Sequence, residues 1–246
     1  MKNSQTFARI IVPALLLFST AVFCGTASLA ATPAHQSAVA QTTATGYNTP
    51  FANGAWKLDD WLLLRNPYSS VIGKWVQKPD HIENAIPDGL TVDEAVKTRI
   101  EDLYVSMVLK NKIEGPATIS TTTSFTPQYA PLIILANDLE EAKPGEFYPR
   151  KYLEIVIYDE GINFWQHWYE GGKERHFKAA WSNFKLKPNK KYKLTVKVNG
   201  NMIEANVDGH TLGWRSPDMP NSFYAGIVAC EGLNKFYDFN IKPYRP

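Results

Sequence analysis

The densest run of chemically useful side chains is INFWQHWY, residues 162–169. If this run is a strand, alternation sends Asn163, Trp165, His167 and Tyr169 to one face. Flat aromatic surface beside hydrogen-bonding tips suits a sugar, whose C–H face stacks on a ring while its hydroxyls take polar partners. We therefore interpret this face as a sugar site with Trp165 and Asn163 in contact with the ligand. An aromatic outer face packed under a loop is the alternative.

Residues 174–181, ERHFKAAW, offer a second polar face. Strict alternation places Glu174, His176, Lys178 and Ala180 on one side and Arg175, Phe177, Ala179 and Trp181 on the other. If this strand forms a hairpin with the preceding one, His176 and Lys178 approach His167 and Tyr169, although the Gly171-Gly172 connection allows several registers. A His beside a Tyr can abstract a proton next to a uronic acid while a cation neutralises the carboxylate. His167, Tyr169 and His176 are therefore predicted catalytic residues for a lyase, with Lys178 binding substrate.

A third face belongs to residues 152–158, where Tyr152, Glu154, Val156 and Tyr158 lie on one side. Glu154 is predicted to be an acid, a base or a sugar ligand, and Tyr152 and Tyr158 to contact substrate. A solvated acid on a half-exposed strand is the alternative. Retaining sandwich glucanases place several acids alternately along one strand, whereas Val156 and Tyr158 occupy the matching positions here. This difference argues against such a glucanase.

Two further groups of residues outside these three faces are candidates for binding substrate or metal. Arg150, just before that strand, is predicted to hold an acidic sugar by bidentate contact, with a solvated basic loop as the alternative. Calcium is left open as a cofactor because one group of residues offers oxygen ligands, namely Asn137, Asp138, Glu140 and Glu141. No EF-hand spacing occurs, and the histidines at 81, 167, 176 and 210 form no recognised zinc pattern. Beyond calcium, no cofactor or metal site is predicted.

The elements that must position these residues are almost all strands from about Trp56 onward. Alternating apolar runs recur every 10 to 20 residues, and Asn199-Gly200 and Asp208-Gly209 are hairpin turn signals. One helix is predicted, beginning at a capping box of Thr91 and Glu94 and continuing to about residue 103. The pattern predicts an all-β fold, an antiparallel sandwich or barrel with one short helix.

Several of these strands resemble the 3-keto-disaccharide hydrolase family. The motifs are YLEIVIYD (152–159), KKYKLTV (190–196), IEANVDG (203–209), GIVA (226–229) and FYDFNI (236–241), and residues 75–84 are similar to the family's opening strand. The resemblance covers about residues 74–242 and implies a concanavalin A-like, laminin-G-like jelly-roll β-sandwich whose concave sheet face holds a glycan. By analogy of fold, it also implies hydrolysis of a sugar bond.

The N-terminus has the order of a secretory signal, with Lys2 and Arg9, an apolar run over residues 10–23, and then small residues up to Ala30. The run is shorter than the roughly 20 residues that span a bilayer. We expect cleavage after Ala30, export to the periplasm or the extracellular space, and no membrane association afterwards.

After this signal, residues 31–52 are expected to be a flexible lead-in, because they are rich in Ala, Thr and Gln and nearly free of charge. Residues 53–246 are expected to form one sandwich domain. Cleavage removes Cys24 and leaves Cys230, so no internal disulfide is expected.

The net charge of the chain bears on whether its partner is a nucleic acid. The whole chain carries a formal net charge of +2, but residues 1–30 hold two cations and no acid, so the mature chain is neutral. A neutral chain lacks the basic excess that phosphate neutralisation needs, which argues against nucleic acid.

The sequence therefore predicts an exported carbohydrate-active protein whose partner is an oligo- or polysaccharide. The leading hypothesis is a hydrolase of glycosidic bonds, because we expect export without a catalytic module that a binding domain would serve. The alternatives are a non-catalytic, lectin-like glycan-binding module, favoured by the missing carboxylate triad, and a polysaccharide lyase with a His/Tyr site. A structural or protein-interaction sandwich without a sugar ligand is a further alternative.

Overall fold

The computed structural model describes residues 46–65, 72–97, 103–127, 129–171 and 173–243. The predicted signal segment, residues 1–30, and most of the predicted lead-in lie outside these ranges. Within them, no helix has the length and apolar character needed to cross a membrane.

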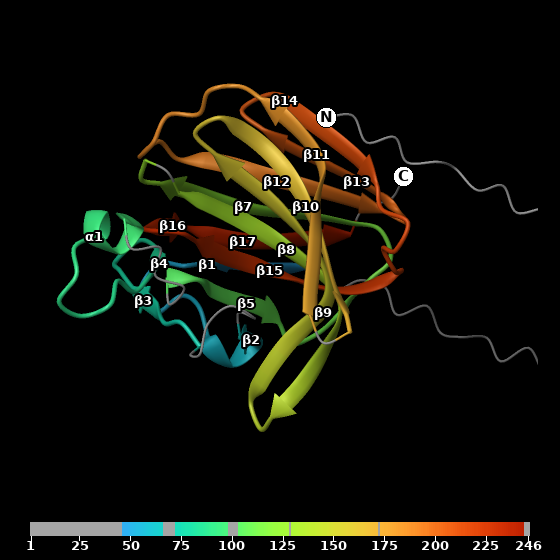
Figure 1. Cartoon of the computed structure of the whole chain (residues 1–246), viewed down its shortest axis with the longest axis horizontal. Coiled ribbons are helices and arrows are strands. Elements are labelled where there is room, and N and C mark those ends of the chain that lie inside the picture. The colour runs from blue at the N-terminus through green and yellow to red at the C-terminus, as the bar shows by residue number, and fades with distance from the viewer. Residues whose placement is uncertain (1–45, 66–71, 98–102, 128, 172, 244–246) are drawn as a thin grey trace, which may run out of the picture. The chain divides into compact units, whose positions relative to one another are not determined.

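Two β-sheets carry almost all of the described chain (Figure 1). Sheet A contains nine described strands: β1 (Tyr47–Pro50), β3 (Trp75–Gln77), β4 (Ile82–Asn84), β7 (Ala117–Phe125), β12 (Tyr192–Asn199), β13 (Met202–Val207), β14 (His210–Arg215), β16 (Asn234–Phe236) and β17 (Asp238–Pro243). Its order is β14-β13-β12-β7-β16-β4-β3, and β17 pairs with both β7 and β1.

Sheet B contains eight described strands: β2 (Trp61–Leu64), β5 (Val105–Leu109), β6 (Ile113–Glu114), β8 (Ala130–Lys143), β9 (Glu146–Tyr158), β10 (Gly161–Glu170), β11 (Lys173–Asn183) and β15 (Ser222–Cys230). Strands β11, β10, β9, β8, β15 and β5 follow one another as antiparallel neighbours. A single parallel bridge joins β2 to the start of β9 in the described residues, at Leu64 and Phe147. This confirms the predicted all-β antiparallel sandwich.

Alternating side chains explain the core between the sheets. In β12, Leu194 and Val196 are buried in the core, whereas Lys193 and Lys197 are exposed on the outer face. Fully burying such an aliphatic side chain is worth about 1.5–3 kcal/mol. The predicted turn between β13 and β14 also forms, with positive φ values of 51° at Asp208 and 84° at Gly209.

The outer face of sheet B, the side opposite the core, is also largely buried. A second apolar cluster lies there and includes Leu64, Val108, Ile134, Val156 and Val228. The central strands of sheet B are therefore apolar on both faces, and a polar side chain placed among them is withdrawn from water.

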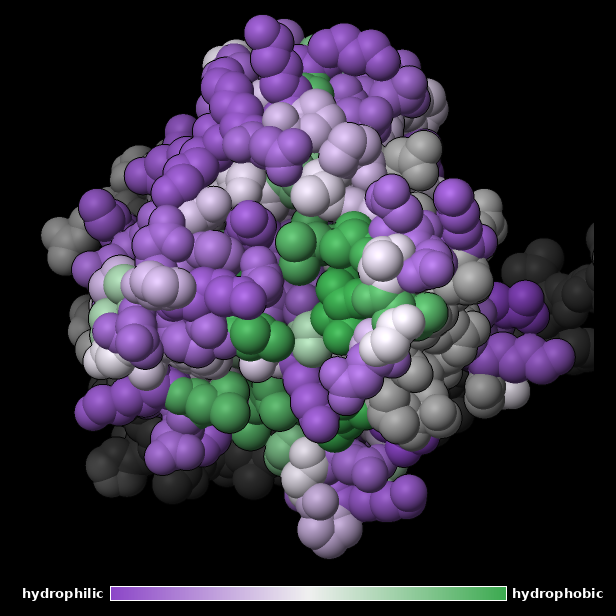
Figure 2. All heavy atoms as spheres, turned by 90° about the vertical axis from the view of Figure 1, so that its left-hand side faces the viewer, coloured by the Kyte–Doolittle hydropathy of each residue, from purple (hydrophilic) through white to green (hydrophobic). Residues whose placement is uncertain are grey.

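The predicted helix is present as α1 (Val92–Lys97), beside a short 3₁₀ turn, η1 (Leu58–Asp60). Its capping box forms as predicted, because Thr91 N donates to Glu94 Oε2 at 2.8 Å and Glu94 N donates to Thr91 Oγ1 at 3.2 Å. The predicted continuation over residues 98–102 lies outside the described residues. Hydrophobic side chains gather near the centre of the face on the α1 side, with hydrophilic ones around them (Figure 2).

One predicted boundary needs correction. Residues 47–50 fall in the expected lead-in (31–52), yet they form β1, which pairs with β17. Phe51, which follows, is completely buried. The sandwich therefore begins by Tyr47 and not at residue 53. The sequence of this strand, YNTP, has no long apolar alternation, so the strand depends on its pairing with β17 and on the buried Phe51 ring that follows it.

Candidate functional site

Strand register brings the three predicted polar faces together on the outer face of sheet B. Between β9 and β10, Glu154 faces Trp165 and Tyr152 faces His167. Between β10 and β11, His167 faces His176 and Trp165 faces Lys178. Directly opposed residues project to the same side of a sheet, so these side chains form one continuous surface.

His167 is the centre of a buried polar network on this surface. Its Nδ1 lies 2.9 Å from Glu174 Oε1, and its Nε2 lies 3.3 Å from Glu154 Oε2. Burial by itself lowers the pKa of His167, but the adjacent Glu154 and Glu174 side chains outweigh burial and raise that pKa to about 9. At neutral pH His167 is therefore a cation held between two carboxylates.

Two tyrosines complete the network. The Tyr152 ring stacks on His167 with centroids 4.4 Å apart and planes 9° from parallel, and its hydroxyl donates to Glu174 Oε1. Tyr104, just before β5, donates its hydroxyl to Glu154 Oε1 at 3.3 Å. Burial first, and neighbouring negative groups second, raise the pKa of both phenols well above the usual value. Both tyrosines are therefore hydrogen-bond donors to the carboxylates.

These protonation states limit the acid–base chemistry. An imidazolium with a pKa of about 9 does not accept a proton at neutral pH. The pKa of Tyr169 is raised to about 12, first by burial and then by Glu174, so this phenol also keeps its proton. Of the other two predicted catalytic side chains, Glu154 is almost entirely buried, whereas His176 is exposed.

An open aromatic and cationic surface adjoins the buried network. The Lys178 ammonium lies 5.2 Å from the centroid of the partly buried Trp165 ring, and the exposed His176 ring lies 5.7 Å from it. A sugar ring stacked on Trp165 would meet hydrogen-bonding groups on both side chains.

A β-bulge adds Trp181 to this surface. The β10–β11 register shifts because Ala180 faces Phe164 while Lys178 faces Trp165, so one residue of β11, Ala179, is extra. Beyond the bulge, Trp181 faces Asn163 and so lies on the site side. Strict alternation predicted the opposite face for Trp181, and the extra residue is the reason that prediction was wrong. The side chain is 58% exposed.

The remaining predicted site residues, Asn163, Arg150 and Tyr158, lie outside the His167 network. Asn163 is 7% exposed, and its Oδ1 has no hydrogen-bond partner within the described ranges. The Arg150 guanidinium lies 5.2 Å from the centroid of the Tyr169 ring and pairs with Glu140 at 2.5 Å. Tyr158 ends β9 opposite Gly161, four residues from Glu154, so the structure does not bring it to the network.

Several site residues were missed in the sequence. Glu174 was placed on the correct face but given no role, because its approach to His167 depends on the register. Tyr104 and Ser106 come from β5 and the residue before it, on the far side of β8 and β15. Alternation with the inward-facing Val105 and Met107 was the available signal, since it sends both residues outward.

The acids proposed as calcium ligands are largely engaged by cations or by backbone. Asp138 pairs with Lys112 at 2.5 Å, and Glu141 Oε1 accepts from Gly145 N at 2.8 Å. Asn137 donates to the Asp218 carbonyl at 2.8 Å. Across the described ranges, no three His, Cys, Asp or Glu side chains are arranged to hold a metal.

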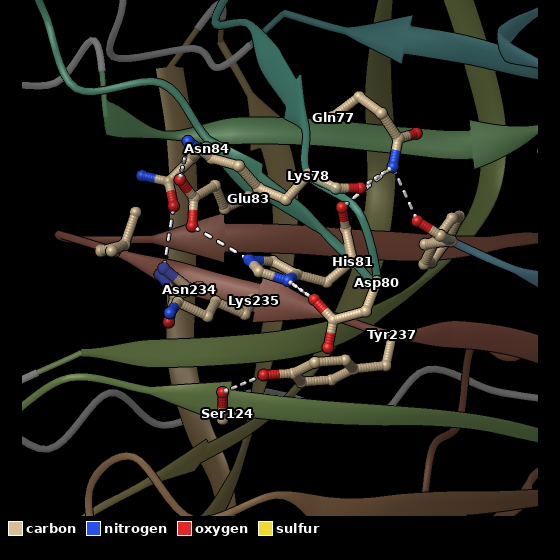
Figure 3. A network of polar contacts seen from close by, with 12 residues as sticks. Gln77, Lys78, Asp80, His81, Glu83, Asn84, Ser124, Asn234, Lys235 and Tyr237 are labelled. Atoms are coloured by element: carbon tan, nitrogen blue, oxygen red, sulfur yellow. Dashed lines mark hydrogen bonds and ion pairs between the residues drawn. The ribbon is translucent and has the colours of Figure 1, made fainter. Parts of the chain in front are cut away.

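A second polar network lies on the outer face of sheet A, around His81 (Figure 3). His81 Nδ1 lies 2.6 Å from Asp80 Oδ1 and Nε2 lies 3.2 Å from Glu83 Oε2, while the Tyr237 ring packs 5.3 Å from the imidazole. Gln77 Nε2 donates to the backbone carbonyls of Phe51 and His81. Because these contacts join the β3–β4 hairpin to Phe51, which follows β1, and to Tyr237, which follows β16, we interpret this network as holding the hairpin in place.

No protein-family model matches the sequence, and no curated protein matches it. Solved structures match the fold at low sequence identity. The carbohydrate-binding module CBM66 from Bacillus subtilis has a TM-score of 0.50 and 11% identity, over 74% of this chain and 95% of that one. The exoplasmic/lumenal domain of VIP36, in its Ca²⁺/Man-bound form, has a TM-score of 0.52 and 11% identity, over 82% and 90%.

A xylan β-1,4-xylosidase from Bacillus halodurans C-125 also matches, with a TM-score of 0.51 and 12% identity. That match covers 79% of this chain and 38% of the xylosidase. At such identities the likeness concerns the fold alone. Together with the two antiparallel sheets, it establishes that this chain is a concanavalin A-like jelly-roll β-sandwich.

Proposed function

We propose that this protein is exported and binds a glycan on the outer face of sheet B. One observation carries the proposal: Trp165 and the exposed Trp181 share a face with His176 and Lys178, beside the buried His167 network. Aromatic faces with adjacent polar tips match the apolar and hydroxylated sides of a sugar ring.

The buried network supports binding because it holds the surface rigid. The two carboxylates and the stacked Tyr152 ring fix the His167 imidazole on both edges and one face. Residues preorganised in this way lose little entropy when a ligand arrives. Structures of similar fold include a carbohydrate-binding module and a lumenal domain with bound mannose, which adds support by analogy.

Hydrolysis of a glycosidic bond is the second candidate. The observation that favours it is the convergence of Glu154 and Glu174 on opposite nitrogens of His167, since a pair of carboxylates is what glycoside hydrolysis requires. The resemblance of the strand motifs to 3-keto-disaccharide hydrolases points the same way. Binding is the better-supported function, because both carboxylates are less than a tenth exposed and already hold an imidazolium.

The lyase alternative has less support. Proton abstraction needs a basic group near the substrate. Two of the three residues proposed for this chemistry, His167 and Tyr169, have a raised pKa and keep their protons at neutral pH. The third, His176, is exposed beside Trp165, outside the buried network.

Retention on immobilised glycans tests the binding proposal. The mature chain is passed over neutral and uronic-acid polysaccharides, beside the variants Trp165→Ala and Trp181→Ala. We expect retention by the wild type and a loss of about tenfold or more in each variant, because each ring buries apolar sugar surface. Phe177→Ala is the matched control, because Phe177 is 46% exposed on the opposite side of β11 and should leave retention unchanged.

The same incubations separate binding from cleavage. Reducing ends that appear with the wild type and disappear with Glu154→Gln would establish hydrolysis. Retention without reducing ends would support binding without hydrolysis. Absence of retention on every glycan would contradict the proposal.

Export is tested on the full chain expressed from Met1. We expect a mature protein outside the cytoplasm whose mass corresponds to cleavage after Ala30. The variant Leu16→Arg places a charge in the apolar run and should stay inside at full length. An uncleaved wild type inside the cell would contradict export.

A further inference from the structure

A small hollow lies beside the His167 network on the outer face of sheet B. Its volume is about 30 Å³, which admits roughly one small polar group. Leu64, Ile134 and Val228 provide apolar walls. The polar lining comes from Tyr104, Ser106, Tyr152, Glu154 and His167.

Two buried polar atoms of this lining have no hydrogen-bond partner in the described part of the chain, namely Ser106 Oγ and His167 Nε2. Each residue is 7% exposed. His167 Nε2 is 3.3 Å from Glu154 Oε2, an ion-pair distance without the direction of a hydrogen bond. Leaving buried polar atoms without hydrogen bonds is costly. A ligand group that enters the hollow could therefore form the hydrogen bonds that Ser106 Oγ and His167 Nε2 lack.

The lining prescribes the chemistry of that group. The carboxylate of Glu154 only accepts hydrogen bonds, protonated His167 only donates, and the Ser106 hydroxyl does either. A hydroxyl group matches all three, because it donates and accepts at once. An ammonium cannot accept from His167, and a carboxylate cannot donate to Glu154 and meets its negative charge.

We propose that the hollow is a subsite for the hydroxymethyl group of a neutral hexose. This inference rests on the proposed glycan binding and names the class of sugar. Trp165 faces Glu154 across β9 and β10, so a sugar ring stacked on the indole lies next to the hollow. The hydroxymethyl group protrudes from the sugar ring and ends in the hydroxyl that the polar lining requires.

The cationic side chains near the hollow do not change the inference of a neutral hexose. Arg65 also lines the hollow, but its guanidinium is held by Glu146 at 2.7 Å. Arg150 pairs with Glu140, and Lys178 lies against the Trp165 ring at the exposed rim. The groups in the hollow itself select a hydroxyl, so the sugar class is neutral and not the uronic acid that the rim cations favour.

Competition by single sugars tests the proposal on the wild-type mature chain. Methyl glycosides of glucose, galactose and mannose compete with an immobilised glycan that the chain retains. The best competitor is then compared with its 6-deoxy analogue and its uronic acid. We expect both analogues to compete at least about tenfold more weakly, because each leaves buried polar groups of the site without a partner.

The variant Ser106→Ala provides a second test. We expect it to bind the hexose about tenfold more weakly and to narrow the gap between hexose and 6-deoxy analogue. Ser120→Ala is the control, since Ser120 is equally buried at 7% but lies in sheet A. Melting temperatures of both variants verify that they fold. The competition series uses the wild-type chain and does not depend on either variant.

The outcomes separate the two proposals. Equal competition by hexose and 6-deoxy analogue, with retention still dependent on Trp165, would overturn the subsite and leave glycan binding in place. Tighter binding of the uronic acid would also overturn it, in favour of acidic sugars. Absence of retention on every glycan, including the neutral ones, would overturn both.

Discussion

The His167 imidazole and the Glu174 carboxylate meet at 2.9 Å although the two residues are not opposite each other in the β10–β11 pair. The register places His176 opposite His167 and Glu174 opposite Tyr169. Glu174 therefore reaches His167 along the diagonal, a separation that long side chains span. This contact, with Glu154 on the other nitrogen, makes His167 a buried cation.

The first prediction concerns pH and stability. The pKa of His167 is about 9 in the folded protein and about 6.5 when unfolded, so the folded state binds the proton more tightly. Its stabilisation is present in full below about pH 6.5 and is lost as the pH rises through 9. We expect this residue to contribute about 3 kcal/mol to the fall in unfolding free energy from pH 6 to pH 10.

Urea unfolding of the wild type and His167→Gln across that pH range measures this contribution. The difference between the two proteins should shrink as the pH rises. His176→Gln, an exposed histidine on the same hairpin, is the control and should track the wild type. A pH-independent difference between His167→Gln and the wild type would show that His167 is not a cation in the fold.

The second prediction concerns Glu174. Replacing it by Gln removes one of the two charges that hold His167 protonated, so the pKa of His167 should fall. The variant should also lose about 2 kcal/mol of stability, since a hydrogen bond between charged groups is weakened in a buried site. A histidine NMR titration gives the pKa. Glu170→Gln, at an exposed position in the same hairpin, should change neither quantity.

The third prediction concerns the turn between β9 and β10. Gly161 has a φ of +136°, and a Cβ there would lie 2.1 Å from the Ser182 carbonyl oxygen. Gly161→Ala should destabilise the fold by about 3 kcal/mol or more and weaken glycan retention, because β11 must shift. Gly171→Ala has open space around it and a φ of +59°, so it should cost only about 1 kcal/mol. Equal melting temperatures for the two variants would contradict this account.

The fourth prediction concerns His81 on the opposite sheet. His81→Ala removes the contacts with Asp80, Glu83 and Tyr237 that fasten the β3–β4 hairpin. Hydrogen exchange should become faster over residues 75–84, by a factor that corresponds to about 1 kcal/mol. Glycan retention should be unchanged. Lost retention in a folded His81→Ala protein would place the glycan on sheet A instead.

Local patterns were enough to predict most of the fold. Alternation with a period of two identified the inward side of β12 and the shared outward face of Tyr152 and Glu154, because side-chain direction in a strand depends only on position along it. The Asp208-Gly209 turn and the Thr91–Glu94 cap are also local, and both form. Strand β1 was missed because its stability comes from a distant partner, β17.

Tertiary structure decided how the candidate residues meet. Register is set by contacts between strands, so no spacing in the sequence could place Glu174 on His167 or Tyr104 on Glu154. The bulge at Ala179 moved Trp181 to the site face, and one extra residue of this kind leaves no compositional signal. Burial of Glu154 required the second apolar cluster on the outer face of sheet B. Apart from Trp181, which lies beyond the bulge, the sequence alone predicted which of these side chains face outward, because side-chain direction alternates along a strand. Only the packed sheets decided which of them are buried, charged and in contact.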